Sequence, residues 1–137
     1  MKVFGERQGS NMKFMMIVKL DGKSEAARNY AAGTPPDERL EAALAKLMEK
    51  MTKSGMLLGV GGLLPVTNGA RIQASGGKLR MTDGPFIESK EVIGGYALLE
   101  TKFKEEAVEL GKEFMQIHLD ILGPSYEGEL EIRQLFE

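Results

Sequence analysis

The order of apolar and polar positions predicts strands and helices that alternate along the chain. Residues 14–18 are apolar at every position, which is typical of an inner strand covered on both faces. Residues 21–33 are polar and rich in alanine, and we expect a loop there with at most one helical turn. From Leu40 to Met51 apolar residues recur at intervals of three and four, so a helix is predicted over residues 37–54.

Residues at both ends of this helix carry the usual start and stop signals. Thr34 is placed to cap the helix, Pro35 suits the first helical position, and Asp37 lies where a capping acid is expected. Gly55 can adopt the left-handed conformation that ends a helix. The next segment, residues 56–65, is apolar and glycine-rich, so its backbone is expected to lie close to a neighbour or a ligand.

A two-stranded hairpin is predicted over residues 71–82, because two extended runs flank a Gly-Gly turn. This turn pairs Ala74 with Leu79 and Ile72 with Met81, so that apolar residues face apolar residues. The opposite face of the hairpin is polar and carries Arg71, Gln73, Lys78 and Arg80.

The remaining periodic segments complete an α+β fold. We expect a strand over residues 92–100, a helix over 103–118 and a strand over 129–136. The whole order fits a ferredoxin-like split βαβ, with a largely antiparallel sheet and two helices on one face. A second subunit is the simplest cover for the other face, so a homodimer through the sheet face is predicted. Residues 1–12 are expected to form a flexible arm and residues 13–137 a single domain.

Composition narrows the classes of function. The chain has no cysteine, which excludes disulfides, thiolate metal sites and cysteine nucleophiles. Eighteen basic and twenty acidic residues argue against nucleic-acid binding. No apolar run approaches the roughly 18 residues of a membrane helix, so we expect a cytoplasmic protein without membrane contact. The single histidine cannot form a multi-histidine metal site, and the sequence carries no motif for a nucleotide or flavin, so no cofactor is expected.

A sharp break between two extended segments surrounds residue 83. It combines a carboxylate, a turn, an aromatic ring and a run of charges in Thr82-Asp83-Gly84-Pro85-Phe86, Glu88, Lys90, Glu91 and Gly94-Gly95-Tyr96. With Gly62-Leu63-Leu64-Pro65 and the ending Glu131-Ile132-Arg133-Gln134-Leu135, these residues make the sequence similar to the YCII-related family, in its DGPF branch. The resemblance covers residues 12–136.

The resemblance implies a ferredoxin-like subunit that forms a dimeric α+β barrel, with a site in a cleft between sheet and loops. The family's other branch carries a proposed acid-base pair of a histidine and an aspartate, with the histidine soon after the first strand. Residues 19–35 contain no histidine, so only the aspartate carries over, as Asp83. The resemblance therefore implies a fold more firmly than a reaction.

The candidate site residues lie around this break, and each has two interpretations. Asp83 is the candidate catalytic acid or base, or a turn residue that bonds its own backbone. Phe86 is expected either to fix this turn in place or to form an apolar wall of the substrate-binding pocket. Glu88 and Lys90 either border a substrate pocket or belong to a solvated loop. Arg71 either anchors a charged substrate or forms an ion pair.

Two further residues, Arg133 and His118, are expected to have mainly structural roles. Arg133 lies in the middle of a strand, on the same face as Glu131 and Glu129, so an ion pair is expected there, with the anchoring of an acidic substrate as the alternative. His118 follows the apolar stripe of the second long helix, where a backbone carbonyl or water would satisfy it. The alternative is an acid-base pair between His118 and Asp83.

Two hypotheses of function follow. The first is a cofactor-independent enzyme that acts on a small organic acid or carbonyl compound by acid-base chemistry, with Asp83 moving the proton. The second is a non-catalytic dimer that binds a small ligand or regulates a partner. The sequence does not decide between an enzyme and a binding module.

Overall fold

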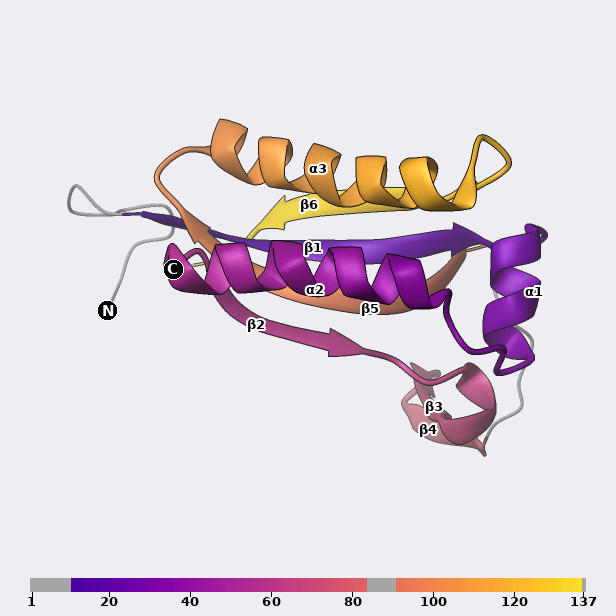
Figure 1. The fold of residues 1–137 in the computed structure, drawn as a ribbon. Coiled ribbons are helices and arrows are strands. Elements are labelled where there is room, and N and C mark those ends of the chain that lie inside the picture. Colours follow the sequence, from indigo (N-terminus) through magenta and orange to yellow (C-terminus); the bar gives the residue numbers. More distant parts are fainter. Residues whose placement is uncertain (1–10, 84–90, 137) are drawn as a thin grey trace.

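The computed structural model describes residues 11–83 and 91–136 (Figure 1). The helices and strands, in chain order, are β1 (Met12–Asp21), α1 (Glu25–Ala31), α2 (Glu38–Lys53), β2 (Leu57–Gly62), the short 3-10 helix η1 (Val66–Asn68), β3 (Ala70–Ser75), β4 (Lys78–Asp83), β5 (Glu91–Thr101), α3 (Lys104–Leu122) and β6 (Glu129–Gln134).

Four strands form one antiparallel sheet in the order β2-β5-β1-β6. The central pair, β1 and β5, runs in register from Met12 opposite Thr101 to Asp21 opposite Glu91, with one irregularity after Val18. Helices α2 and α3 lie next to each other on one face of this sheet, and α1 lies at the end of β1 (Figure 1). The structure is thus a mixed α+β fold, compatible with the ferredoxin-like arrangement that we predicted.

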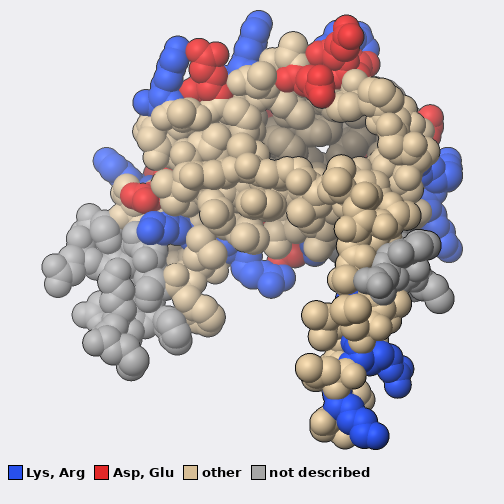
Figure 2. Space-filling view, turned by 90° about the horizontal axis from the view of Figure 1, so that it is seen from below, with Lys and Arg blue, Asp and Glu red and all other residues tan. Residues whose placement is uncertain are grey.

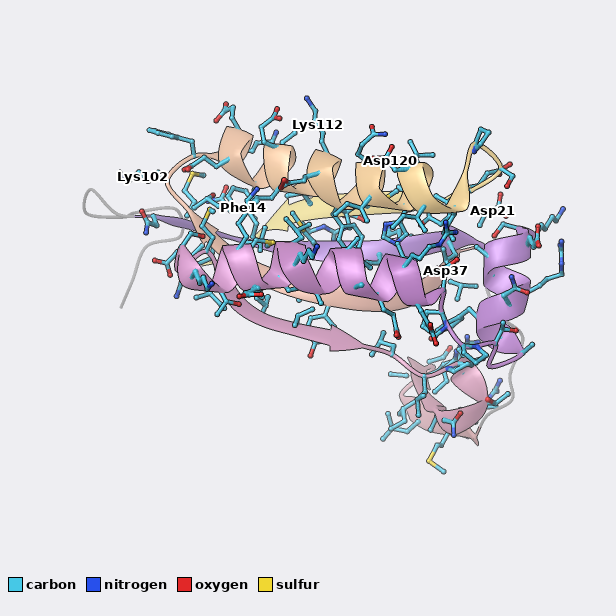
Figure 3. All side chains as sticks on the ribbon, viewed as in Figure 1. Phe14, Asp21, Asp37, Lys102, Lys112 and Asp120 are labelled. Carbon is cyan, nitrogen blue, oxygen red and sulfur yellow. The ribbon has the colours of Figure 1, made fainter. Side chains whose placement is uncertain are left out.

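The core lies between the sheet and the two long helices. Alternation along β1 turns Phe14 and Met16 toward the helices, where they are 2% and 3% exposed. Leu99 of β5 meets the same layer and is fully buried. The buried cluster consists of Phe14, Met16, Leu47, Met51, Ala97, Leu99, Ala107 and Leu110. Figure 3 labels Phe14 of this cluster, which comes from β1.

A glycine sets how closely α3 approaches the sheet. A Cβ atom on Gly111 would stand 2.9 Å from the Cδ1 atom of Ile132 and 3.1 Å from the Cδ2 atom of Leu130. Both neighbours belong to β6, so the missing side chain lets the helix backbone lie against that strand. The packing of α3 on β6 therefore depends on this residue.

The hairpin of β3 and β4 is a separate two-stranded sheet that projects from the body (Figures 1 and 2). Its register confirms the predicted pairs of Ile72 with Met81 and Ala74 with Leu79. Gly76 and Gly77 have φ values of 59° and 76°, as a type I′ turn requires. The prediction that this hairpin belongs to the main sheet is therefore wrong. The fourth strand of that sheet is instead β2, which we expected only as a close-lying glycine-rich segment.

The start of α2 differs from the prediction. Asp37, not Thr34, caps the helix, and its Oδ1 atom accepts a hydrogen bond of 2.8 Å from the backbone N–H of Arg39. Two consecutive prolines explain the shift, because a residue before proline is disfavoured in helical conformation. The end agrees with the prediction, since Gly55 has a φ of 78°. Residues 25–31, expected in a loop, form the short helix α1, which Ser24 caps.

We expect core and hairpin leucines to differ sharply in their contribution to stability. Leu99→Ala should lower the free energy of unfolding by about 2–5 kcal/mol, because Leu99 is fully buried and the change leaves a cavity. The matched change Leu79→Ala should cost less than about 0.5 kcal/mol, because that side chain is 77% exposed. Urea denaturation measures both values, and equal losses would contradict this account of the core.

Candidate functional site

A cavity of about 1120 Å³ lies between the helices and the sheet. Its walls come from β1, α1, α2, β2, β5 and α3, together with the segments that follow α1, β2 and α3. The lining is mostly apolar, and Figure 2 shows a hollow framed by uncharged atoms. A concave, largely apolar space with few polar groups is the usual form of a small-molecule site.

Missing side chains on the sheet explain why this part of the layer is hollow. Gly95 lies opposite Val18 on one side and Gly62 on the other, and Val18 lies opposite Leu130, so two of the four positions in this row of the sheet are glycines without side chains. A Cβ atom on Gly95 would stand 2.9 Å from the carbonyl oxygen of Gly61, so a larger residue would force the strands apart. The glycines of β2 and β5 thus leave the floor of the cavity open.

A hydrogen bond ties two walls of the cavity together. The hydroxyl of Tyr30, on α1, donates to the backbone carbonyl of Leu63, after β2, at 2.5 Å. Both residues line the cavity. The contact joins segments that are 33 residues apart in the chain and holds α1 against the β2 side of the opening.

His118 is the buried titratable side chain of the cavity wall, and it is 7% exposed. Its Nδ1 atom lies 2.9 Å from the backbone carbonyl oxygen of Phe114, one helical turn earlier. The imidazole also contacts two aromatic rings, with its centroid 4.7 Å from that of Phe114 and 5.1 Å from that of Tyr126. The Nδ1 contact confirms the expectation that a backbone carbonyl bonds the histidine. The sequence did not indicate that His118 also lines a cavity.

Burial determines the protonation states of His118 and Tyr126 in the cavity wall. It lowers the pKa of His118 below the usual value of 6.5, although the bond to the Phe114 carbonyl acts in the opposite direction. Burial also raises the pKa of Tyr126 above 10.0. At neutral pH the imidazole and the phenol are therefore both uncharged, and the site has the character of an apolar pocket with neutral polar groups.

Charged side chains are sparse in the lining. Asp37 is the acidic residue among the described lining residues, and it lies at the N-terminal end of α2 (Figure 3). Its carboxylate already bonds to Arg39, and these bonds lower the pKa of Asp37. The described lining contains no lysine or arginine. Among the described residues no group of three or more His, Asp and Glu side chains is placed to hold a metal ion.

The residues that we predicted for the site lie elsewhere or outside the described part of the chain. Arg71 is exposed on β3, and the described residues of the hairpin do not line the cavity. The backbone of Asp83 pairs with Ala70 at the end of β4, but its side chain is not described. Phe86, Glu88 and Lys90 also lie outside the described residues. The catalytic and binding roles suggested for these residues stay predictions.

The outer face of the sheet carries the ion pair expected at Arg133. Glu131 bonds Arg133 on its own strand, and its Oε1 atom lies 2.5 Å from the Nζ atom of Lys19 on β1. Lys19 and then Arg133 lower the pKa of the Glu131 carboxyl. The three side chains form one network across β1 and β6, which satisfies the prediction of a paired arginine.

Sequence reasoning missed Tyr30 and Tyr126 as site residues. Tyr126 lies between the predicted helix over residues 103–118 and the predicted strand over 129–136, and Tyr30 lies in the segment expected to be a loop. The spacing of Phe114 and His118, four residues apart on one helix, was a signal for an aromatic contact. The contact with Tyr126 depends on the path of the chain after α3.

Fold and cavity together define an α+β protein in which two helices cover one face of an antiparallel sheet and form, with that sheet, a half-open pocket. The sequence matches the YCII-related domain over residues 12–120, and the chain belongs to this family. An uncharacterized protein of Rhizobium meliloti (strain 1021) is 32% identical over 99 residues, which span 72% of this chain and 75% of that relative. No helix in the described part of the chain is long and apolar enough to cross a membrane.

The buried histidine predicts how stability depends on pH. The pKa of His118 is lowered in the folded protein, so the unfolded chain takes up the proton first as the pH falls below about 6.5. The stabilising effect is complete above that value and is lost as the pH falls through the lower pKa of the folded state. We expect wild type to lose more free energy of unfolding than His118→Phe between pH 8 and pH 5.

Urea denaturation of both proteins at a series of pH values measures this difference. The carboxylates are common to both proteins, so their contribution cancels in the comparison. Phenylalanine retains an aromatic ring near Phe114 and Tyr126 and removes the titrating group. The same pH dependence in both proteins would contradict a neutral, buried His118.

Proposed function

We propose that this protein binds a small, neutral and largely apolar organic molecule in the cavity between its helices and its sheet. The observation that supports this function is the cavity itself, whose volume of about 1120 Å³ exceeds what a single small ligand needs. Apolar side chains dominate its walls, so the transfer of apolar ligand surface from water provides the main driving force. The protein would act as a binding or regulatory module.

The charge of the lining supports a neutral ligand. A carboxylate ligand would need a cationic partner, and the described lining residues include neither lysine nor arginine. His118 is neutral at physiological pH because burial lowers its pKa. These features favour a neutral molecule over the organic acid considered from sequence.

We propose binding in preference to acid-base catalysis because the described lining of the cavity is mostly apolar, and its buried imidazole, His118, already bonds a backbone carbonyl. The catalytic hypothesis depends on Asp83, whose side chain lies outside the described part of the structure. We also propose that the chain belongs to the DGPF branch of its family. That finer assignment rests on the motif Asp83-Gly84-Pro85-Phe86.

We further propose that the outer face of the sheet pairs with a second copy of the chain. Alternation along β1 and β5 places Met15, Ile17, Tyr96 and Leu98 on the face away from the helices. The register places Tyr96 opposite Gly61, and a Cβ atom on that glycine would stand 2.8 Å from the tyrosine hydroxyl oxygen. The ring therefore lies over β2 and widens the apolar surface. A second sheet would cover this surface, and the flanking charges of β6 would orient it.

A bulky substitution in the lining should block the cavity. Val60 lies on β2, lines the cavity and is 57% exposed, so Val60→Trp would fill part of the space without disturbing the core. We expect this variant to bind 2-methylnaphthalene at least about tenfold more weakly than wild type, a loss of about 1.4 kcal/mol. Equilibrium dialysis measures the affinity.

Leu58→Trp provides the matched control. Leu58 lies on the same strand and is 49% exposed, but it does not belong to the described lining. Its substitution should change the affinity by less than about twofold, or about 0.4 kcal/mol. If wild type fails to bind the apolar probe, or both variants lose binding equally, the cavity is not the binding site.

A charge on the outer face of the sheet should prevent self-association. We expect light scattering to show a dimer for wild type at micromolar concentration and a monomer for Leu98→Arg, because the change buries an unpaired cation in the interface. Leu119→Arg is the control, since this leucine is 43% exposed on α3 and lies away from the outer sheet face. A monomeric wild-type protein would overturn the proposal.

A further inference from the structure

We propose that the ligand of the cavity carries a hydroxyl or N–H group that donates a hydrogen bond to the Nε2 atom of His118. The ligand is expected to be a neutral aromatic or alicyclic alcohol, or a neutral compound with a non-basic N–H group, such as an indole. This inference rests on the proposed binding function and goes beyond it, because it names the group of the ligand that the cavity recognises and the residue that recognises it.

The first step concerns the proton on the imidazole. The Nδ1 atom lies 2.9 Å from the carbonyl oxygen of Phe114. A carbonyl oxygen only accepts hydrogen bonds, so Nδ1 must carry the hydrogen. In the neutral ring the second nitrogen, Nε2, is then an acceptor with a free lone pair. The tautomer is assigned from this contact.

The second step concerns the orientation of the ring. The hydrogen bond to the Phe114 carbonyl constrains the direction of the Nδ1–H bond. The rings of Phe114 and Tyr126, with centroids at 4.7 Å and 5.1 Å, restrict its tilt. His118 therefore presents its acceptor in a fixed direction before any ligand binds, which reduces the entropy lost on binding.

The third step concerns the unsatisfied acceptor. Nε2 has no hydrogen-bond partner among the described residues, although His118 as a whole residue is only 7% exposed. Polar atoms inside proteins usually have a hydrogen-bond partner, which the protein, water or a ligand supplies. His118 lines the cavity, so a ligand in the cavity can supply the missing donor. A purely apolar ligand would leave Nε2 unsatisfied.

Three probes of similar size separate the contributions to binding. They are 2-methylnaphthalene, which has no polar group, 2-naphthol, which donates a hydrogen bond, and 2-methoxynaphthalene, which only accepts one. Their affinities for wild type and for His118→Phe are measured by equilibrium dialysis at pH 7.5. For each protein, the affinity of each polar probe is divided by that of 2-methylnaphthalene. Hydration of the free probes is the same in both experiments, so it cancels when these ratios are compared between wild type and His118→Phe.

We expect the affinity of 2-naphthol relative to 2-methylnaphthalene to fall about 3- to 10-fold in His118→Phe, as the loss of one hydrogen bond predicts. The relative affinity of 2-methoxynaphthalene should stay the same within about twofold. If the ratio for 2-naphthol is unchanged in His118→Phe, or if it falls instead in Tyr126→Phe, His118 is not the acceptor and the inference is wrong.

A second measurement needs no substitution. His118 is the only histidine in the sequence, so the imidazole nitrogen resonances of labelled protein belong to this residue alone. We expect 2-naphthol to shift the Nε2 resonance clearly more than 2-methylnaphthalene does, and Nδ1 to remain protonated. Equal shifts would overturn the inference while the binding function stands. If no probe binds at all, the proposed function itself fails.

Discussion

The antiparallel pairing of β1 with β5 is the constraint on which the rest of this structure depends. Because side chains alternate along paired strands, this register decides what faces the helices and what faces away. Phe14, Met16 and Leu99 therefore reach the core, and Met15 and Leu98 lie on the outer face. The outer strands β2 and β6 pair with this central ladder and extend both faces. A shift of one residue would exchange the core and the outer surface, so both the buried layer and the proposed dimer surface follow from one pairing.

Core and cavity belong to the same layer and differ in what the sheet supplies to it. Large side chains such as Phe14 and Leu99 fill the layer at one end. At the other end, Gly95 and Gly62 supply no side chains, and the helices cover an open space. The close approach of α3 at Gly111 holds this helix against β6, so the space is not closed by a shift of the helix. Core residues such as Met16 and Leu47 also form part of the cavity wall, so the packed core and the cavity share one boundary. His118 lies in this wall with one nitrogen bonded within its own helix, and the other nitrogen is the proposed acceptor for a ligand.

Local patterns predicted much of the fold. The hairpin was predicted with its register, because the Gly76-Gly77 turn and the apolar pairing of Ile72 with Met81 specify the same alignment. The long helix and its end at Gly55 were also predicted. The helix α1 was missed because it is only seven residues long, and the edge strand β2 because glycines interrupt its pattern. The candidate site was predicted around residue 83, whereas the described cavity is formed by residues of β1, β2, β5 and the three helices.

The sequence by itself determined the features that depend on neighbours within a few residues. These are the faces of the two long helices, the hairpin turn, and the carbonyl that satisfies His118 one helical turn away. It also determined membership of the YCII-related family, through residues spread along most of the chain. Only the tertiary structure decided that β2 completes the sheet, that the hairpin stands apart from it, and that His118 and Tyr126 meet in the wall of a cavity. Those features depend on contacts between distant parts of the chain, and such contacts leave no periodic signal in the sequence.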